Sequence, residues 1–269
     1  MERDEQVPTV IDPNTPSVAR MYDYYLGGKD NFPSDREAAE KITQLVPNIS
    51  QIARDNRDFL IRVVRMLAAA GVRQFIDIGT GLPTRQNVHE VALEAAPDSR
   101  IVYVDNDPIV LVHARALLAE TPQTIVVGAD LRDTASILDH PEVGAHIDFG
   151  RPVAVLLFAI LHFVPDHQES ADIVRRLCAP LAVGSHLAVS HSYAGDLTSE
   201  TISTGRTVYR AATAGSLTPR TTEQISAYFD GLDVLEPGVV PIDAWRPEWP
   251  DVEPDFTKPG LLGGVARIP

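Results

Sequence analysis

An apolar run that ends in glycines, Phe75-Ile76-Asp77-Ile78-Gly79-Thr80-Gly81, constrains the fold of this chain more than any other feature. A second apolar run ends in the carboxylate Asp105, 24 residues after Gly81. A strand that runs into glycines, followed by a helix and a second strand ending in an acid, begins a Rossmann-like βαβ unit. The glycines let the backbone approach a ligand, and the carboxylate can accept hydrogen bonds from ribose hydroxyls. The pattern predicts a nucleotide-cofactor site, although these residues can also serve only to shape a turn.

The charge around these glycines bears on which cofactor the site takes. Dinucleotide sites place a pyrophosphate at a helix N-terminus, usually with the pattern G-x-G-x-x-G. Here Thr84 stands in place of the third glycine. Asp77, two residues before Gly79, would repel a phosphate and attract an ammonium or a sulfonium. These residues therefore favour S-adenosylmethionine over NAD.

Composition narrows the class of protein and of partner. The 269 residues suit one α/β domain with an extension. The 23 basic and 37 acidic residues give a net charge of −14, which argues against nucleic acid as a partner. One arginine-rich helical segment is the best candidate for a basic strip, and we interpret it as a solvated helix face. Its arginines are Arg54, Arg57, Arg62 and Arg65.

Cysteine usage and the N-terminus bear on location. Cys178 is the only cysteine, so neither an intrachain disulfide nor a thiolate metal cluster can form. The acidic start of the chain lacks the apolar core of a signal peptide. No run of ~18 apolar residues indicates a membrane span. We expect a cytoplasmic protein without a membrane partner, and the sequence does not decide its oligomeric state.

Apolar runs alternate with helical segments, which predicts a parallel sheet covered by helices. Residues 1–16 are polar and proline-rich and predict a loose arm, whereas residues 51–70 have helical spacing. Further helices should follow the first, second and fourth strands, and Thr221 with Gln224 predicts a capping box for another. The expected strands are residues 74–78, 100–105, 124–128, 153–158, 186–191, 232–236 and 264–268.

Residues 17–40 interleave tyrosines, glycines and charged residues in a way that is unusual for a plain helix. Several segments have a distinctive sequence: 19–32 (ARMYDYYLGGKDNF), Asn56-Arg57, 77–84 (DIGTGLPT), 103–108 (YVDNDP), 161–166 (LHFVPD) and 236–240 (EPGVV). Together they resemble the actinobacterial S-adenosylmethionine-dependent methyltransferase-like family. The N-terminal segment is distinctive, whereas the glycine motif belongs to class I methyltransferases generally.

The resemblance implies an α/β fold of the Rossmann-like class I methyltransferase type. Its sheet would have seven mostly parallel strands with the last one antiparallel, helices on both faces and an N-terminal helical cap. Residues 1–70 would then form the arm and the cap or lid, and residues 71–269 the S-adenosylmethionine-binding domain. The family does not imply a known methyl acceptor.

The resemblance also implies cofactor roles for acids at the strand ends. Asp77 matches the carboxylate near the methionine amino group. Asp105 matches the acid that holds the ribose, with Asn106 and Asp107 as competitors for part of that role. Asp130, followed by Leu131, matches the position that accepts the adenine amino group. As alternatives, Asp105 can cap a helix and Asp130 can cap a turn.

The end of the expected fourth strand, with Phe158 and Ala159, should face the reactive end of the cofactor. His162 is the first candidate for a general base and His191 the second, although either can be a hydrogen-bonded histidine of the core. The histidines His162, His167, His186 and His191 do not match a metal-ligand spacing, so we predict no metal.

The tyrosine-glycine segment can act as a lid. Aromatic rings exclude water and attract a sulfonium, and the glycines there permit close backbone approach. We therefore expect Tyr22, Gly28, Lys29 and Asn31 to fold over the methionine end of the cofactor. The alternative is that the aromatic residues only pin the segment onto the sheet.

The hypothesis that joins these observations is methyl transfer from S-adenosylmethionine to a small-molecule acceptor. The acceptor pocket would be shaped by residues 193–217, which are rich in Thr, Ser and Gly. A non-catalytic S-adenosylmethionine-binding sensor or partner module would use the same cofactor contacts and stays an alternative. An NAD-dependent oxidoreductase shares the βαβ unit, but Asp77 and the missing third glycine count against it.

Overall fold

The computed structural model of the chain describes residues 12–84, 86–118, 121–248 and 252–269. Most of the loose arm predicted for residues 1–16 lies outside these ranges. The strands are β1 (Gln74–Ile78), β2 (Arg100–Asp105), β3 (Thr124–Gly128), β4 (Ala154–Phe158), β5 (His186–Tyr193), β6 (Asp233–Val234), β7 (Val240–Pro241) and β8 (Gly260–Arg267).

The α-helices and two 3₁₀ helices alternate with these strands along most of the chain. They are α1 (Val18–Tyr25), α2 (Pro33–Leu45), α3 (Ile49–Ala69), α4 (Val88–Ala95), α5 (Pro108–Leu117), α6 (Thr134–Leu138), α7 (Pro141–His146), η1 (Leu161–Phe163), α8 (His167–Cys178), α9 (Ser199–Arg210), α10 (Thr222–Ser226) and η2 (Ala227–Phe229). None of the helices in the described ranges is long and apolar enough to cross a membrane.

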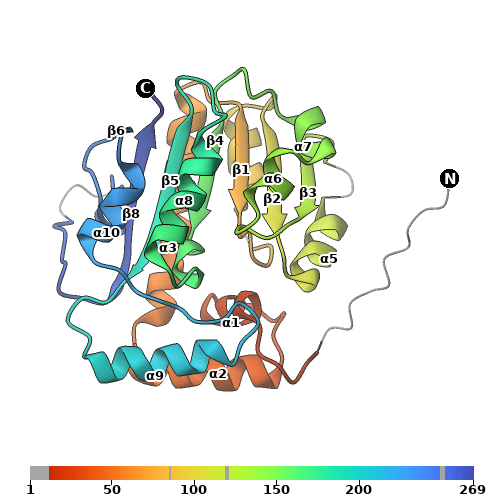
Figure 1. The fold of residues 1–269 in the computed structure, drawn as a ribbon. Coiled ribbons are helices and arrows are strands. Elements are labelled where there is room, and N and C mark those ends of the chain that lie inside the picture. The colour runs from red at the N-terminus through yellow and green to blue at the C-terminus, as the bar shows by residue number, and fades with distance from the viewer. Residues whose placement is uncertain (1–11, 85, 119–120, 249–251) are drawn as a thin grey trace.

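The strands form one sheet in the order β3-β2-β1-β4-β5-β8-β6, as Figure 1 shows. The strands β1 to β5 pair in parallel, and β8 runs antiparallel to β5. The predicted seven-stranded sheet with an antiparallel last strand is therefore confirmed. The strand order reverses between β1 and β4, which is the point where open α/β sheets bind their ligands.

The edge of the sheet beside β8 differs from the prediction. The strand expected over residues 232–236 pairs with β8 only at β6, and an unpredicted second segment, β7, pairs with β8 further on. Between them the backbone N–H of Gly238 donates to the carbonyl of Leu235, which forms a turn. This turn interrupts the edge strand and leaves two short pieces in place of one.

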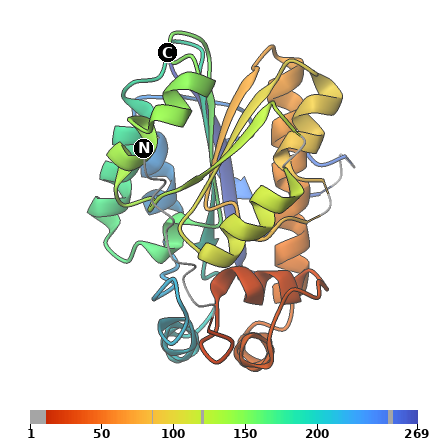
Figure 2. The same cartoon turned by 90° about the vertical axis from the view of Figure 1, so that its right-hand side faces the viewer.

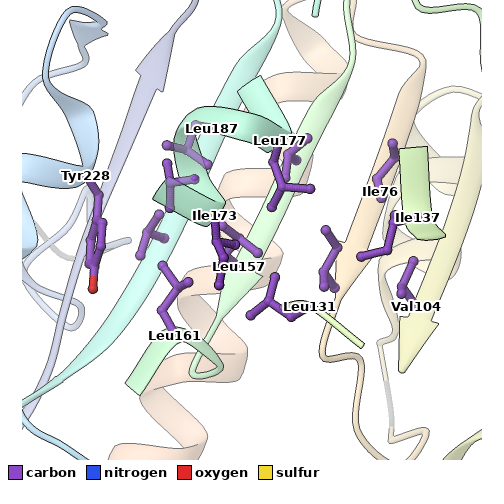
Figure 3. Packing of buried hydrophobic residues seen from close by; sticks show 14 of the residues in the cluster. Ile76, Val104, Leu131, Ile137, Leu157, Leu161, Ile173, Leu177, Leu187 and Tyr228 are labelled. Carbon is purple, nitrogen blue, oxygen red and sulfur yellow. The ribbon is translucent and has the colours of Figure 1, made fainter. Parts of the chain in front are cut away.

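Helices cover both faces of the sheet, and Figure 2 shows this layering edge-on. On one face, α6, α7, α8 and α10 cover a core that includes Leu157 and Leu187. Figure 3 shows Ile173 and Leu177 of α8 lying among these residues. On the other face, α3 and α4 pack through residues such as Phe59, whose ring contacts Phe158 edge-on at 5.3 Å. The continuous apolar runs of the strands are explained by this burial on two sides.

A third layer of α1, α2 and α9 lies across the carboxyl ends of the parallel strands, as Figure 1 shows. The layer joins the N-terminal segment to the helix that follows β5, because α2 packs beside α9. The two helices face each other at Gly205, where a Cβ would lie in ordinary van der Waals contact with Leu45, 3.8 Å away. The division predicted at residue 70 stays a prediction, and α3 itself packs against the sheet.

Asp35 explains why residues 17–40 do not form a plain helix. Its buried carboxylate accepts the backbone N–H of Ser17 at 2.8 Å and that of Phe32 at 2.7 Å. The same carboxylate accepts Nε–H of Arg20 at 2.6 Å in a buried ion pair. Because these donors come from both helices, one charged residue at the start of α2 holds α1 and α2 together.

Candidate functional site

A cavity of about 390 Å³ lies between the carboxyl ends of the parallel strands and the layer of α1, α2 and α9. Its wall contains residues of β1, β2, β4 and β5 on one side and of all three helices on the other. Most of the site residues expected from the sequence line it. These are Tyr22, Asp77, Gly79, Gly81, Asp105, Asn106, Phe158, Ala159 and His162.

The loop after β1 requires glycine at two positions. Gly79 has φ of 76° and Gly81 has φ of 66°, in the left-handed region that favours glycine. A Cβ at Gly79 would also lie 2.5 Å from the side chain of Ile160, whereas a Cβ at Gly81 would meet no atom within 4 Å. The turn is closed by the backbone N–H groups of Gly79 and Thr80, which both donate to the carbonyl of Val104.

Asp77 is a buried carboxylate that lines the cavity. Burial raises its pKa to about 7, the Arg57 guanidinium acts in the opposite direction, and the neighbouring Asp105 raises it further. Among the described residues, no side chain or backbone N–H donates a hydrogen bond to this carboxylate. An unpaired buried carboxylate is costly, and a bound cation would relieve that cost.

Asp105 holds the loop to the end of β2. One carboxylate oxygen accepts the backbone N–H of Gly81 and the other accepts that of Asp107, each at 2.9 Å. Burial raises the pKa of Asp105, and these two hydrogen bonds partly offset the shift. The next acid, Asp107, caps α5 by accepting the N–H of Ile109. Each oxygen of Asp105 keeps a lone pair for a ligand hydroxyl.

The structure does not bring Asp130 and Leu131 to the cavity wall. Asp130 accepts Nε–H and Nη2–H of Arg132 at 2.9 and 2.6 Å, and the Arg132 side chain lowers its pKa to about 2. Its link to the cavity is Asn106, whose amide donates to the Asp130 carboxylate at 3.2 Å. Leu131 packs in the hydrophobic core with residues of α6 and α8, and Figure 3 shows it among these core side chains.

A buried chain of hydrogen bonds ties the end of β4 to α1. Ala159 has φ of 52°, a conformation that costs a residue other than glycine about 1 kcal/mol or more. Its backbone N–H donates to the hydroxyl of Ser190, which donates to the Asn56 side chain at 2.6 Å. Asn56 in turn donates to the Tyr22 hydroxyl, and that hydroxyl donates to the carbonyl of Ala53. Tyr22 is thereby fixed on the cavity wall.

The geometry of His162 argues against the general base that the sequence suggests. Its Nδ1 accepts the backbone N–H of Ser192 at 3.3 Å, so the neutral ring carries its proton on Nε2. Burial, then His191 and Arg220, lowers the pKa of His162 well below its usual value, so the ring is neutral at physiological pH. Nε2 makes no hydrogen bond with any described residue. His162 is therefore set up to donate a hydrogen bond into the cavity.

His191 is a core histidine and does not line the cavity. Its Nε2 accepts Nη1–H of Arg220 at 2.6 Å, and its Nδ1–H donates to the carbonyl of Ser192. Burial lowers its pKa to about 3. Arg220 also donates to the carbonyls of Leu161 and Val164, and so it holds the segment that carries His162. Neither nitrogen of His191 is available to a ligand.

Gly28, Lys29 and Asn31 lie in the turn between α1 and α2 and not on the cavity wall. A Cβ at Gly28 would collide with the carboxylate of Asp23. Asn31 donates to that carboxylate at 2.8 Å, and Lys29 is exposed. Of the four residues expected to form a lid, only Tyr22 lines the cavity. Gly28 and Asn31 shape the turn that places α1 across the end of the sheet.

Several residues that line or support the site were not predicted from the sequence. The interpretation of the arginine-rich segment as a solvated face holds for Arg54 and Arg65, but Arg57 lines the cavity and Arg62 donates to two carbonyls near Trp245. Arg57 belongs to the Asn56-Arg57 segment that carries the family resemblance, so the sequence did contain a signal for its role in the site. Ser190, Arg206 and Arg220 carry no local signal, because each acts only through tertiary contacts. Among the described residues, no three His, Cys, Asp or Glu side chains gather as a metal site.

Comparison with known proteins agrees with this geometry. The model of a family described as S-adenosyl methyltransferase matches residues 4–269. A crystal structure of a DUF574 family protein from Streptomyces avermitilis is 43% identical, with a TM-score of 0.88 over 96% of this chain and 99% of that chain. A candidate methyltransferase from Thermobifida fusca is 40% identical, with a TM-score of 0.87 over 98% of this chain and 99% of that chain.

More distant structures share the fold alone. The N-methyltransferase NodS from Bradyrhizobium japonicum, solved with S-adenosyl-L-homocysteine, is 14% identical, with a TM-score of 0.51 over 93% of this chain and 99% of that chain. No relative is found among the curated proteins.

Proposed function

The chain belongs to the S-adenosyl methyltransferase family, and we propose that it transfers the methyl group of S-adenosylmethionine to a small molecule bound in the cavity under α1, α2 and α9. S-adenosylmethionine is the methyl donor of the family. The observation that carries the proposal is Asp77, an unpaired buried carboxylate that lines the cavity beside the glycine turn. A carboxylate in that setting favours a cationic ligand, and the donor carries an ammonium and a sulfonium.

The roles of the residues follow from their positions on the wall. Asp77 would hold the ammonium, and Asp105 would accept ribose hydroxyls with the lone pairs that Gly81 and Asp107 leave free. Asn106, hydrogen-bonded to Asp130, would extend the site toward the adenine. These assignments rest on lining, burial and hydrogen-bonding capacity.

The far end of the cofactor would lie against the end of β4. Phe158 and Ala159 line the cavity there, and the strained backbone of Ala159 is held by Ser190. Tyr22 closes the wall from α1. An aromatic ring near the sulfonium adds cation–π attraction and excludes water.

In this reaction the protein would mainly position the two reactants and exclude water. When bound, S-adenosylmethionine supplies a methyl group on a positively charged sulfur. The chemistry it would supply is a displacement, in which a lone pair of the acceptor would bond to the methyl carbon as the carbon–sulfur bond broke and its electron pair stayed on sulfur. The protein would hold the attacking atom, the methyl carbon and the sulfur in line, and orientation of this kind can supply roughly 7 to 11 kcal/mol of a barrier. His162 would donate Nε2–H to an acceptor oxygen, and a proton released by the acceptor would leave to solvent.

The test is to titrate the purified protein with S-adenosylmethionine, S-adenosylhomocysteine and NAD by calorimetry. Asp105→Ala should lose affinity for both S-adenosylmethionine and S-adenosylhomocysteine. Asp139→Ala, which changes an exposed acid away from the cavity, should keep that affinity. Retained affinity in Asp105→Ala, or binding of NAD alone, would contradict the proposal. Formation of S-adenosylhomocysteine from the donor in a cell extract then separates an enzyme from a sensor that only binds.

A further inference from the structure

The cavity wall is divided by charge. Three acids line it: Asp77 lies next to the last residue of β1, Asp105 ends β2 and Asp107 follows β2. The part formed by α2, the start of α3, α9 and the segment after it holds no acid among the described residues that line the cavity. Its apolar side chains include Ile42, Leu45, Ile49, Ile52, Ile202 and Leu217.

One cation, Arg206 of α9, lines this apolar part. It forms no ion pair with any described acid, and its Nε is buried without a hydrogen-bond partner. Arg57 also lines the cavity and has a buried Nε without a partner, but its charge acts on Asp77, and its Nη2 donates to the carbonyl of Gln86. Three other arginines with little exposure are satisfied: Arg20 pairs with Asp35, and Arg62 and Arg220 donate to backbone carbonyls. A buried polar group without a partner costs stability, and a ligand that accepts its hydrogen bond would relieve that cost.

The remaining polar side chains in this part, which include the hydroxyls of Thr201 and Thr213, are neutral and can donate hydrogen bonds. Tyr25 and Tyr209 line the cavity, and burial raises the pKa of both, so each hydroxyl keeps its proton. The hydroxyl oxygen of Tyr25 is buried without a hydrogen-bond partner. His162 presents Nε2–H for the reason given above. A wall of apolar surface, neutral donors and one unpaired guanidinium complements a ligand with an apolar body and an anionic oxygen group.

We propose that the methyl acceptor is an apolar carboxylic acid whose carboxylate pairs with Arg206, an inference that rests on the proposed function. Arginine is suited to this partner because its planar fork matches a carboxylate in two parallel hydrogen bonds. The protein as a whole carries a net charge of −14, which disfavours an anion. Selection of an acid over a neutral compound of the same shape therefore depends on this guanidinium.

The test compares 2-naphthoate with 2-naphthamide, which share an apolar ring system and differ in charge. Each is titrated by calorimetry into the full-length protein, with and without saturating S-adenosylhomocysteine. The acid should bind roughly tenfold tighter than the amide or more, as expected for a charged hydrogen-bonded pair. In Arg206→Gln the ratio should fall to about one, while affinity for S-adenosylhomocysteine stays unchanged.

Arg210→Gln is the matched control, because Arg210 is exposed on the same helix and does not line the cavity. It should keep the full preference for the acid. Equal affinities in the unmodified protein, no binding of either compound, or a preference that persists in Arg206→Gln overturns the proposal. Failure of S-adenosylhomocysteine to bind would instead count against the proposed function, and the titrations without it still decide the role of Arg206.

Discussion

Binding of the methyl donor should release close to one proton from Asp77 at pH 6. In the free protein, burial raises the pKa of this carboxyl group to about 7, so it is mostly protonated at pH 6. If the ammonium of the ligand lies beside Asp77, the charged carboxylate is favoured in the complex and its pKa falls. The proton that the free protein holds must then leave when the ligand binds.

The size of the effect follows from the pKa. With a pKa of about 7, roughly nine-tenths of the molecules hold the proton at pH 6 and roughly a tenth at pH 8. The release should therefore fall from about 0.9 proton at pH 6 to about 0.1 at pH 8. Over the same interval the apparent affinity should rise about tenfold, because protonated Asp77 competes with binding at the lower pH.

The assay is calorimetry with S-adenosylhomocysteine in two buffers that differ in their heat of ionisation. The difference between the two observed enthalpies gives the number of protons released. Asp77→Asn is the informative variant, since it keeps the shape of the side chain and removes the titrating group. Asp139→Asn changes an exposed acid away from the cavity and should behave like the unmodified protein.

Two results would refute this reasoning. A proton count near zero at pH 6 in the unmodified protein would mean that Asp77 does not meet the ligand cation or does not have a raised pKa. A release that persists in Asp77→Asn would assign the proton to another group, and Asp105, whose pKa is also raised by burial, would be the first to examine.

Three further predictions concern stability and are measured by urea unfolding. Because ionised Asp77 is disfavoured in the folded state, the free energy of unfolding should fall as pH rises from about 4 to 7. At pH 8, Asp77→Asn should be more stable than the unmodified protein by roughly 1 to 4 kcal/mol. Equal pH profiles of the two proteins would contradict this. Gly79→Ala, which forces a contact with Ile160, should cost roughly 2 to 4 kcal/mol, whereas Gly81→Ala should cost only about 1 to 2, and equal costs would contradict the packing argument. Asn56→Ala should cost roughly 1 to 3 kcal/mol, since it leaves the Ser190 hydroxyl without its acceptor, and a smaller loss would mean that water replaces the amide.

The central strands could be predicted almost residue by residue, because they are buried on both sides and leave continuous apolar runs. The strands β1, β2 and β3 have the predicted bounds, β4 begins one residue later at Ala154, and β5 continues to Tyr193. The edge of the sheet was harder, since β6 and β7 have two residues each and no periodicity to detect. The acid that caps α5, Asp107, was predictable from the proline that follows it.

The helical layer over the site was the part that local pattern could not predict. The helix α9 lies within residues 193–217, which were expected only to shape a pocket. Its sequence is rich in Ser, Thr and Gly, residues with modest helix propensity, and only Tyr209 is fully buried. The helix is stabilised by the cap at Thr198 and by packing on α2, and the second of these is a tertiary contact.

The contrast between strands with a clear local pattern and a helix held by tertiary contacts also explains which half of the site could be predicted. In a parallel sheet, residues at the ends of neighbouring strands meet at one edge, so Asp77 and Asp105 converge wherever the strands form. The acceptor half has no such rule, because Arg206 meets the end of the sheet only once α9 has folded back on α2. On the proposed assignment, the cofactor contacts would depend on the sheet and the choice of acceptor on the helical layer. Substitutions in α2 or α9 should therefore alter which compound is methylated without altering affinity for the donor.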